Sequence, residues 1–206
     1  MRKHHNKLFF GKYTHKATFK VPNINVLYPT SDYYIDKMLS KFKIDEPIAK
    51  LGNFIMDNRQ NMKFRIQNNN ITFYTNKSLS LDLIKNFWEN WCNVTTVDIK
   101  NLKLLKKDTV VCKRLPLGKF KYQVHVDRNM YHKISSEQRD QLYNYLIRNT
   151  DNATITNSNL KQWLSGAGAI HYDLNGYFYV KDEKALLPIY IISDKIVGHV
   201  RKFVRV

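Results

Sequence analysis

Two short motifs contain the residue types that bind metal ions or activate water. They are His125-Val-Asp127 and His171-Tyr-Asp173. Residues i and i+2 of a β-strand share one face, so each pair can hold a divalent cation or join a general base to its orienting carboxylate. The same spacing arises often by chance. The expected state of both motifs is therefore a surface pair, or a histidine that donates to its neighbour.

Other catalytic signatures are missing from the sequence. It has no P-loop, no Gly-x-Ser-x-Gly and no zinc motif, and Cys92 and Cys112 stand apart without a CxxC spacing. Histidine-paired replication nickases, which use a ferredoxin-like sheet, require two histidines flanking an apolar residue, and Gln123-Val-His125 departs from that pattern. We predict a protein that is not an enzyme and needs no cofactor or metal. A replication-associated, metal-dependent nuclease using His125 and Asp127 is an alternative.

Lysine and arginine outnumber the acidic residues two to one. The chain of 206 residues has 34 Lys and Arg against 17 Asp and Glu, which gives a net charge of +17. Residues 1–103 contribute +9 and residues 104–206 contribute +8, so the excess belongs to both halves. Such an excess repels itself in the folded state, and a polyanion neutralises it. We therefore expect nucleic acid as the partner, with RNA favoured.

The basic residues concentrate in an N-terminal arm, in the middle of the chain and in the C-terminal tail. Lysine binds phosphate as a mobile point charge and reads base identity poorly. This predicts binding to the backbone of folded RNA or of DNA, with little sequence readout. The predicted contacts are Arg2, Lys3, Lys7, Lys12, Lys16, Lys100, Lys103, Lys106, Lys107, Lys113, Arg114, Lys119, Lys121, Arg128, Arg201, Lys202 and Arg205.

The elements that must position these residues recur along the chain at an offset of about 105 residues. Residues 65–75 and 170–180 both read as a short strand, an Asn-rich turn and a second strand that contains Phe-Tyr. An apolar helical run and a closing strand follow each. Gly11-Lys12-Tyr13 and Gly118-Lys119-Phe120 open the first strand of each half. The recurrence predicts an internal duplication.

Each half is predicted to contain a strand, a pair of helices, two strands, a helix and a strand. The last helix of the first half is expected at about Leu79–Trp91, with its tryptophans in the core, and Ser135 with Gln138 forms a capping box for a helix of the second half. Merging the helix pair gives βαββαβ, the ferredoxin-like split arrangement with helices on one sheet face. We predict an α+β fold of two tandem modules. They are 1–103, with the basic arm, and 104–206, with the basic linker and tail.

The third strand of each predicted module is aromatic. Because side chains alternate along a strand, the phenylalanines are expected against the helices and the tyrosines on the other face. The predicted positions are Phe73 and Phe178 on the helical side, with Tyr74, Tyr177 and Tyr179 opposite.

The segment Asn175-Gly-Tyr-Phe-Tyr-Val180 is loosely similar to the aromatic third-strand motif of RNA-recognition-motif domains. It lacks the small residue between the two aromatics and the basic residue before the glycine. The resemblance implies that bases stack on these tyrosines. Packing of the tyrosines against the other module or against a partner protein is the alternative.

The two isolated cysteines favour a reducing compartment, and the longest apolar run, Ala185–Ile192, is too short to span a bilayer. We expect an intracellular protein of the cytoplasm, an organelle matrix or a virion interior, with no membrane partner and a viral or organellar composition. The sequence favours a non-catalytic RNA-binding component of a larger ribonucleoprotein assembly. A phage or virus structural protein that contacts packaged genome or partner subunits is a further alternative.

Overall fold

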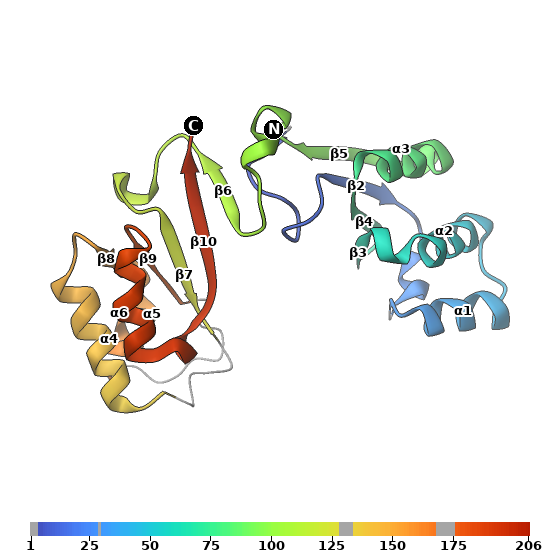
Figure 1. Ribbon diagram of the computed structural model, residues 1–206. Coiled ribbons are helices and arrows are strands. Elements are labelled where there is room, and N and C mark those ends of the chain that lie inside the picture. Colours follow the sequence, from blue (N-terminus) through green and yellow to red (C-terminus); the bar gives the residue numbers. More distant parts are fainter. Residues whose placement is uncertain (1–3, 29, 128–133, 168–175) are drawn as a thin grey trace. The chain divides into compact units, whose positions relative to one another are not determined.

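The computed structural model describes residues 4–28, 30–127, 134–167 and 176–206. The chain forms two compact units, Met1–Lys107 (unit 1) and Asp108–Val206 (unit 2), which divide four residues after the boundary expected at 103. Each unit is α+β, with one mixed five-stranded sheet and one hydrophobic core (Figure 1). Among the described residues, no helix is long and apolar enough to cross a membrane.

Unit 1 places its strands in the order β1-β5-β2-β4-β3, in which β1 is parallel to β5 and the other neighbours are antiparallel. Its elements are β1 (His4–His5), β2 (His15–Lys20), η1 (Ile24–Leu27), α1 (Asp32–Lys41), α2 (Glu46–Asp57), η2 (Arg59–Asn61), β3 (Lys63–Gln67), β4 (Asn70–Thr75), α3 (Lys77–Asn86), η3 (Trp88–Asn90), β5 (Trp91–Val97) and η4 (Ile99–Leu104).

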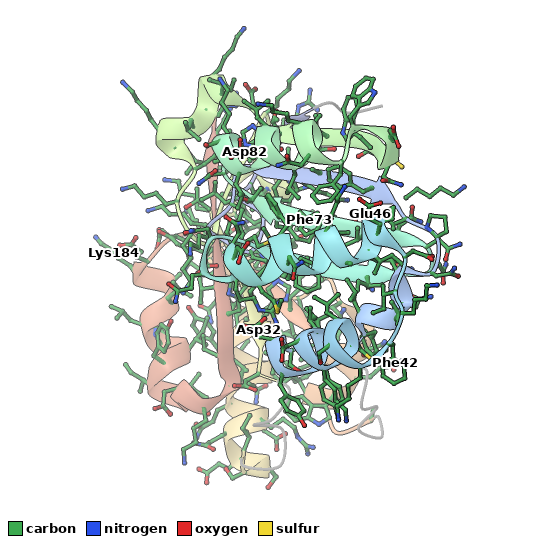
Figure 2. The ribbon with its side chains drawn as sticks, turned by 90° about the vertical axis from the view of Figure 1, so that its right-hand side faces the viewer. Asp32, Phe42, Glu46, Phe73, Asp82 and Lys184 are labelled. Atoms are coloured by element: carbon green, nitrogen blue, oxygen red, sulfur yellow. The ribbon has the colours of Figure 1, made fainter. Side chains whose placement is uncertain are left out.

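The core of unit 1 lies between one sheet face and the helices. Phe19 of β2 and Phe73 of β4 are both 0% exposed, and their ring centroids are 5.8 Å apart. They pack in one cluster with Leu51 and Ile55 of α2 and Leu83 of α3. Figure 2 shows unit 1 from this side, with its helices in front of the strands. The phenylalanines therefore hold the helices on a single face, and strand alternation sends the neighbouring side chains to the other face.

Unit 2 places its strands in the order β6-β10-β7-β9-β8, in which β6 is parallel to β10 and the other neighbours are antiparallel. Its elements are β6 (Thr109–Cys112), η5 (Pro116–Gly118), β7 (Tyr122–Val126), α4 (Ser136–Arg148), β8 (Ala153–Thr154), α5 (Ser158–Leu164), β9 (Tyr177–Val180), η7 (Lys184–Leu186), α6 (Leu187–Ser193), η8 (Asp194–Ile196) and β10 (Val197–Arg205).

The core of unit 2 repeats the layout of unit 1. Val124 of β7 and Phe178 of β9 are fully buried and pack with Leu142 and Leu146 of α4 and Ile189 of α6. The helices of unit 2 thus lie on one side of its sheet, as the ribbon shows (Figure 1). Numbered from the start of each unit, both sheets have the strand order first, fifth, second, fourth, third.

The helix predicted over Leu79–Trp91 is shorter than expected. It ends at Asn86, a 3-10 turn follows, and Trp91 begins β5, where it is paired with Phe19 of β2. Trp88 is 66% exposed, so its predicted place in the core is wrong. The apolar spacing continued past the helix because Trp91 packs on the same core from a strand, and periodicity alone cannot separate the two cases.

Unit 2 also departs from the predicted order of elements. The strand that pairs with β9 is β8, which lies between α4 and α5, so the two helices do not follow each other directly. The first strand of the predicted 170–180 hairpin lies outside the described residues. In unit 1 the equivalent strands β3 and β4 are joined by a tight turn at Asn68, whose φ is 54°. The second helix of the predicted pair is present as α5, but the strand β8 between the two helices has only two residues, too few to show a periodicity.

A loop of the same geometry precedes the second strand of each unit. In unit 1, Lys12 N donates to Phe9 O over 3.1 Å, and the central residues Phe10 and Gly11 have φ of 51° and 67°. In unit 2, Lys119 N donates to Pro116 O over 3.3 Å, and the central residues Leu117 and Gly118 have φ of 48° and 80°. Two consecutive positive φ angles are the mark of a type I′ turn. We call these segments, Leu8–Tyr13 and Leu115–Phe120, the paired loops.

The capping box predicted at Ser135 is confirmed and gives a stability prediction. Gln138 N donates to Ser135 Oγ over 3.1 Å, and the Gln138 side chain accepts from Ser135 N over 3.3 Å. Ser135→Ala is expected to lower the free energy of unfolding by about 1 kcal/mol. Ser136→Ala, one residue later at the first helical position, is the matched control and is expected to change it little. Urea unfolding followed by circular dichroism measures both, and equal losses would contradict the cap.

Candidate nucleic-acid interface

The sheet face opposite the helices, here called the distal face, bears most of the charge of the strands. The described strands contain seven Lys and Arg and no Asp or Glu, whereas α1 to α6 contain eight basic and seven acidic residues. Figure 2 labels three of the helix carboxylates, Asp32, Glu46 and Asp82, on the helical side of unit 1. The positive charge of the strands is therefore not balanced within the sheets. The basic strand residues are Lys16, Lys20, Lys63, Arg65, Arg201, Lys202 and Arg205.

In unit 1 the distal face combines cations with one tyrosine. The register pairs Lys16 and Lys63 with Tyr74, so the three side chains lie in one row across β2, β4 and β3. The ring of Phe10, from the first of the paired loops, meets Tyr74 edge-on at 4.7 Å between centroids, and Lys63 Nζ lies 4.9 Å from the Phe10 ring. Phe9 also contacts Tyr74, at 5.8 Å. Loop aromatics thus cover part of the tyrosine that the sequence placed on this face.

Beside this row the distal face of unit 1 has a polar groove of about 420 Å³. Thr18 of β2 and Thr72 of β4 lie opposite each other in the sheet, and their hydroxyl oxygens are 3.3 Å apart. None of the described residues that line the groove is acidic. They are Lys16, Thr18, Gln67, Asn68, Asn70, Thr72, Cys92 and Asn93.

In unit 2 the distal face is aromatic. Tyr177 and Tyr179 of β9 meet edge-on at 5.5 Å between ring centroids, and Phe203 of β10 lies 6.5 Å from Tyr179. Phe120, from the second of the paired loops, stacks on Tyr179 at 6.2 Å with an interplanar angle of 28°. Burial and the adjacent Tyr177 raise the pKa of Tyr179, so its phenol is neutral at pH 7. Phe120 is only 1% exposed and covers one side of Tyr179, whereas Tyr177, Tyr179 and Phe203 are partly exposed.

Histidines and arginine border these rings. His125 of β7 lies 5.6 Å from Tyr177 and 5.8 Å from His199 of β10, measured between ring centroids. Nε of Arg201 lies 3.3 Å from Nε2 of His199 and donates a hydrogen bond to it when the imidazole is neutral. The same Nε2 lies 3.5 Å from Asp108 Oδ1, and a protonated His199 forms an ion pair with that carboxylate. Arg201 thus gives this surface a fixed positive charge, and the Asp108 carboxylate lies at its border.

Neither His-x-Asp motif belongs to a described metal-binding cluster. His171 and Asp173 lie outside the described residues. His125 projects from the distal face with Tyr177 and His199 as ring neighbours. Within the described parts of the chain, no group of three His, Cys, Asp or Glu side chains is arranged to hold a metal ion.

Two of the predicted phosphate contacts are engaged within unit 2. Lys119 Nζ lies 2.9 Å from Asp151 Oδ1, and this contact lowers the pKa of the carboxyl. Lys202 is on the helical side of β10, where its Nζ is 3.5 Å from Glu183 Oε1. Tyr122 Oη also donates to Glu183 over 2.6 Å and lowers its pKa. Lys202 thus lies on the opposite sheet face from Arg201 and Arg205, the distal cations of the same strand.

The other predicted contacts are distributed over strands, loops and residues that the structure does not describe. Lys12 and Lys16 belong to the first paired loop and β2. The helix η4 contains Lys100 and Lys103. Lys7 is partly buried. The exposed connections between elements contain Lys106, Lys107, Lys113, Arg114 and Lys121. Arg2, Lys3 and Arg128 lie outside the described residues.

Several residues of the distal faces are not among the predicted contacts. Lys63 and Arg65 are two positions apart on β3, a spacing that places both side chains on one face. This spacing of two basic residues could have been recognised in the sequence. The groove amides and Phe203 gave no such signal, because they meet their neighbours only through the register of the sheets.

No family model, no curated protein and no solved structure matches this chain.

Proposed function

We propose that this protein is a non-catalytic nucleic-acid-binding protein, with RNA as the favoured partner, that acts within a larger ribonucleoprotein assembly. The distal faces of its two sheets form the binding surfaces. The cations of the strands contact the phosphate backbone, and the tyrosines of unit 2 offer a surface on which bases stack.

The observation that carries the proposal is the segregation of charge between strands and helices. Asp and Glu are depleted from strands in general, but so is Lys, so strand propensity alone does not produce seven basic residues and no acidic one. A protein that needs charge only for solubility is served well by mixed signs. A polyanion that lies along the distal faces gives that exclusion a physical reason, since a nearby carboxylate would repel phosphate. Aromatic rings beside cations add the second element of single-strand binding.

We further propose that units 1 and 2 are duplicated ferredoxin-like modules, each with an added edge strand. Without β1 and β6, the first and third strands of each unit lie at the centre of its sheet, as the βαββαβ arrangement requires. The paired loops support the duplication, because their turns and hydrogen bonds recur at equivalent places. The Lys12 ammonium lies 5.3 Å from the Tyr13 ring, and the Lys119 ammonium lies 5.2 Å from the Phe120 ring.

Replacing three distal cations is expected to weaken binding far more than replacing three helical ones. The triple variant Lys16→Ala, Lys63→Ala, Arg65→Ala should lower affinity for fluorescein-labelled RNA about 10- to 100-fold and reduce the log–log salt slope by about 2. The control variant, with Lys41, Lys77 and Lys85 of α1 and α3 changed to Ala, loses the same net charge. Fluorescence anisotropy measures both. Equal losses would show that total charge, and not the distal face, determines binding.

Tyr179 separates stacking on bases from packing within the protein. Tyr179→Ala is expected to weaken single-strand binding by about 1–3 kcal/mol, whereas Tyr179→Phe should cost little because the stacking ring remains. Tyr190→Ala, at an exposed position of α6, is the control on the helical side. Affinity and melting temperature are measured on the same samples. A lowered melting temperature with unchanged affinity of the folded protein would contradict stacking and assign the ring to packing with Phe120.

A further inference from the structure

The groove of unit 1 offers a chemistry that backbone binding does not use. Four side-chain amides line it, those of Gln67, Asn68, Asn70 and Asn93. Among the described residues, none of these amides makes a hydrogen bond to another part of the protein. Each amide has two N–H donors and an oxygen acceptor, so the groove presents paired donors and acceptors to a ligand.

The sheet register fixes where these groups lie. Thr72, Thr18 and Asn93 are directly opposite one another on β4, β2 and β5, so they form one row across three adjacent strands. Asn70 occupies the next distal position of β4, opposite Lys20. With neighbouring strands about 4.8 Å apart, the row is roughly 10 Å wide. Because the groups belong to strands, their positions are set before any ligand binds.

We propose that this groove binds the edge of a base in single-stranded RNA and favours adenine. An Asn or Gln side chain pairs with adenine through two hydrogen bonds, to N6 and N7, whereas lysine and arginine favour guanine or phosphate. The groove volume lies in the range of about 300–1,000 Å³ found for small-ligand sites. Lys16 within it and Lys20 beside it are placed for the flanking phosphates. This inference rests on the proposed function and adds base readout by unit 1 to stacking by unit 2.

The test compares oligo(A), oligo(U) and oligo(C) RNA, each labelled with fluorescein, on the full chain. We expect tighter binding of oligo(A), by about tenfold. The double variant Asn70→Ala, Asn93→Ala should lose this preference while its salt slope stays unchanged, because no charge is removed. The double variant Asn53→Ala, Asn86→Ala removes two exposed amides from α2 and α3 and should keep the preference. Melting curves of both variants verify that they fold.

Cys92 provides a second readout, since its exposed thiol lines the groove. Its alkylation by N-ethylmaleimide, resolved by mass spectrometry from that of the less exposed Cys112, should slow in the presence of oligo(A) and slow less with oligo(U). Burial raises the pKa of Cys112, which makes that thiol a slow internal reference. In the Asn70/Asn93 variant the two RNAs should protect Cys92 equally.

The two proposals fail in different ways. If none of the three RNAs binds, the proposed function is wrong and the groove proposal falls with it. If all three bind with equal affinity, and neither the Asn70/Asn93 substitutions nor the choice of RNA changes Cys92 protection, the groove is not a base site while the distal faces still bind RNA.

Discussion

Affinity for single-stranded RNA is expected to fall about 300-fold when monovalent salt rises from about 50 to 200 mM. Affinity for duplex DNA is expected to fall about 2,000-fold over the same range. The estimate counts six phosphate contacts, one for each cation that strand alternation places on a distal face. Each contact releases counterions, so the logarithm of the binding constant falls linearly with the logarithm of the salt concentration. The six are Lys16, Lys20, Lys63 and Arg65 in unit 1, with Arg201 and Arg205 in unit 2.

The slope of this plot measures the number of contacts directly. A titration at several salt concentrations should give a slope near −4 for single-stranded RNA. A steeper slope would indicate that the exposed lysines around η4 also contact phosphate. An affinity that barely changes with salt would contradict backbone binding and favour a protein partner, as in the structural-protein alternative.

The elements with strong local signals were predictable from the sequence. Ser135 with Gln138 starts α4 because both partners of its capping box lie within one turn. Phe73 and Phe178 are buried because each follows the two-residue alternation of a strand in which apolar residues on one face alternate with polar residues or tyrosines on the other. Such signals depend on neighbours in the chain, and the sequence contains all of them.

The sheet partners were not predictable, for two physical reasons. The strands β1 and β8 have only two residues each, which is too short to show any periodicity. The groove joins Asn70 to Asn93 only because β4 and β5 both pair with β2, and nothing local in either segment specifies that register. The candidate site therefore required the structure, although its basic character did not.

The separate cores of the two units make a prediction about stability. Phe178→Ala removes a fully buried ring from unit 2, and Phe73→Ala removes its counterpart from unit 1. Each is expected to lower the free energy of unfolding by about 3–5 kcal/mol, a large part of the 5–15 kcal/mol typical of a domain. Phe42→Ala, at a side chain that is 56% exposed, is the control and should change it by less than about 1 kcal/mol.

Hydrogen exchange followed by mass spectrometry assigns each loss to a unit. With Phe178→Ala, amides of β7, β9 and β10 should exchange faster, because their protection depends on the core that contains Phe178. Amides of β2 and β4 should keep the protection of the unaltered protein, and Phe73→Ala should give the reverse. If either substitution speeds exchange equally in both sheets, the two units unfold together. The separate cores would then not give the units independent stabilities. If the losses stay separate, a variant without a stable unit 2 retains the groove and the four distal cations of unit 1. That variant tests whether base readout depends on unit 1 alone.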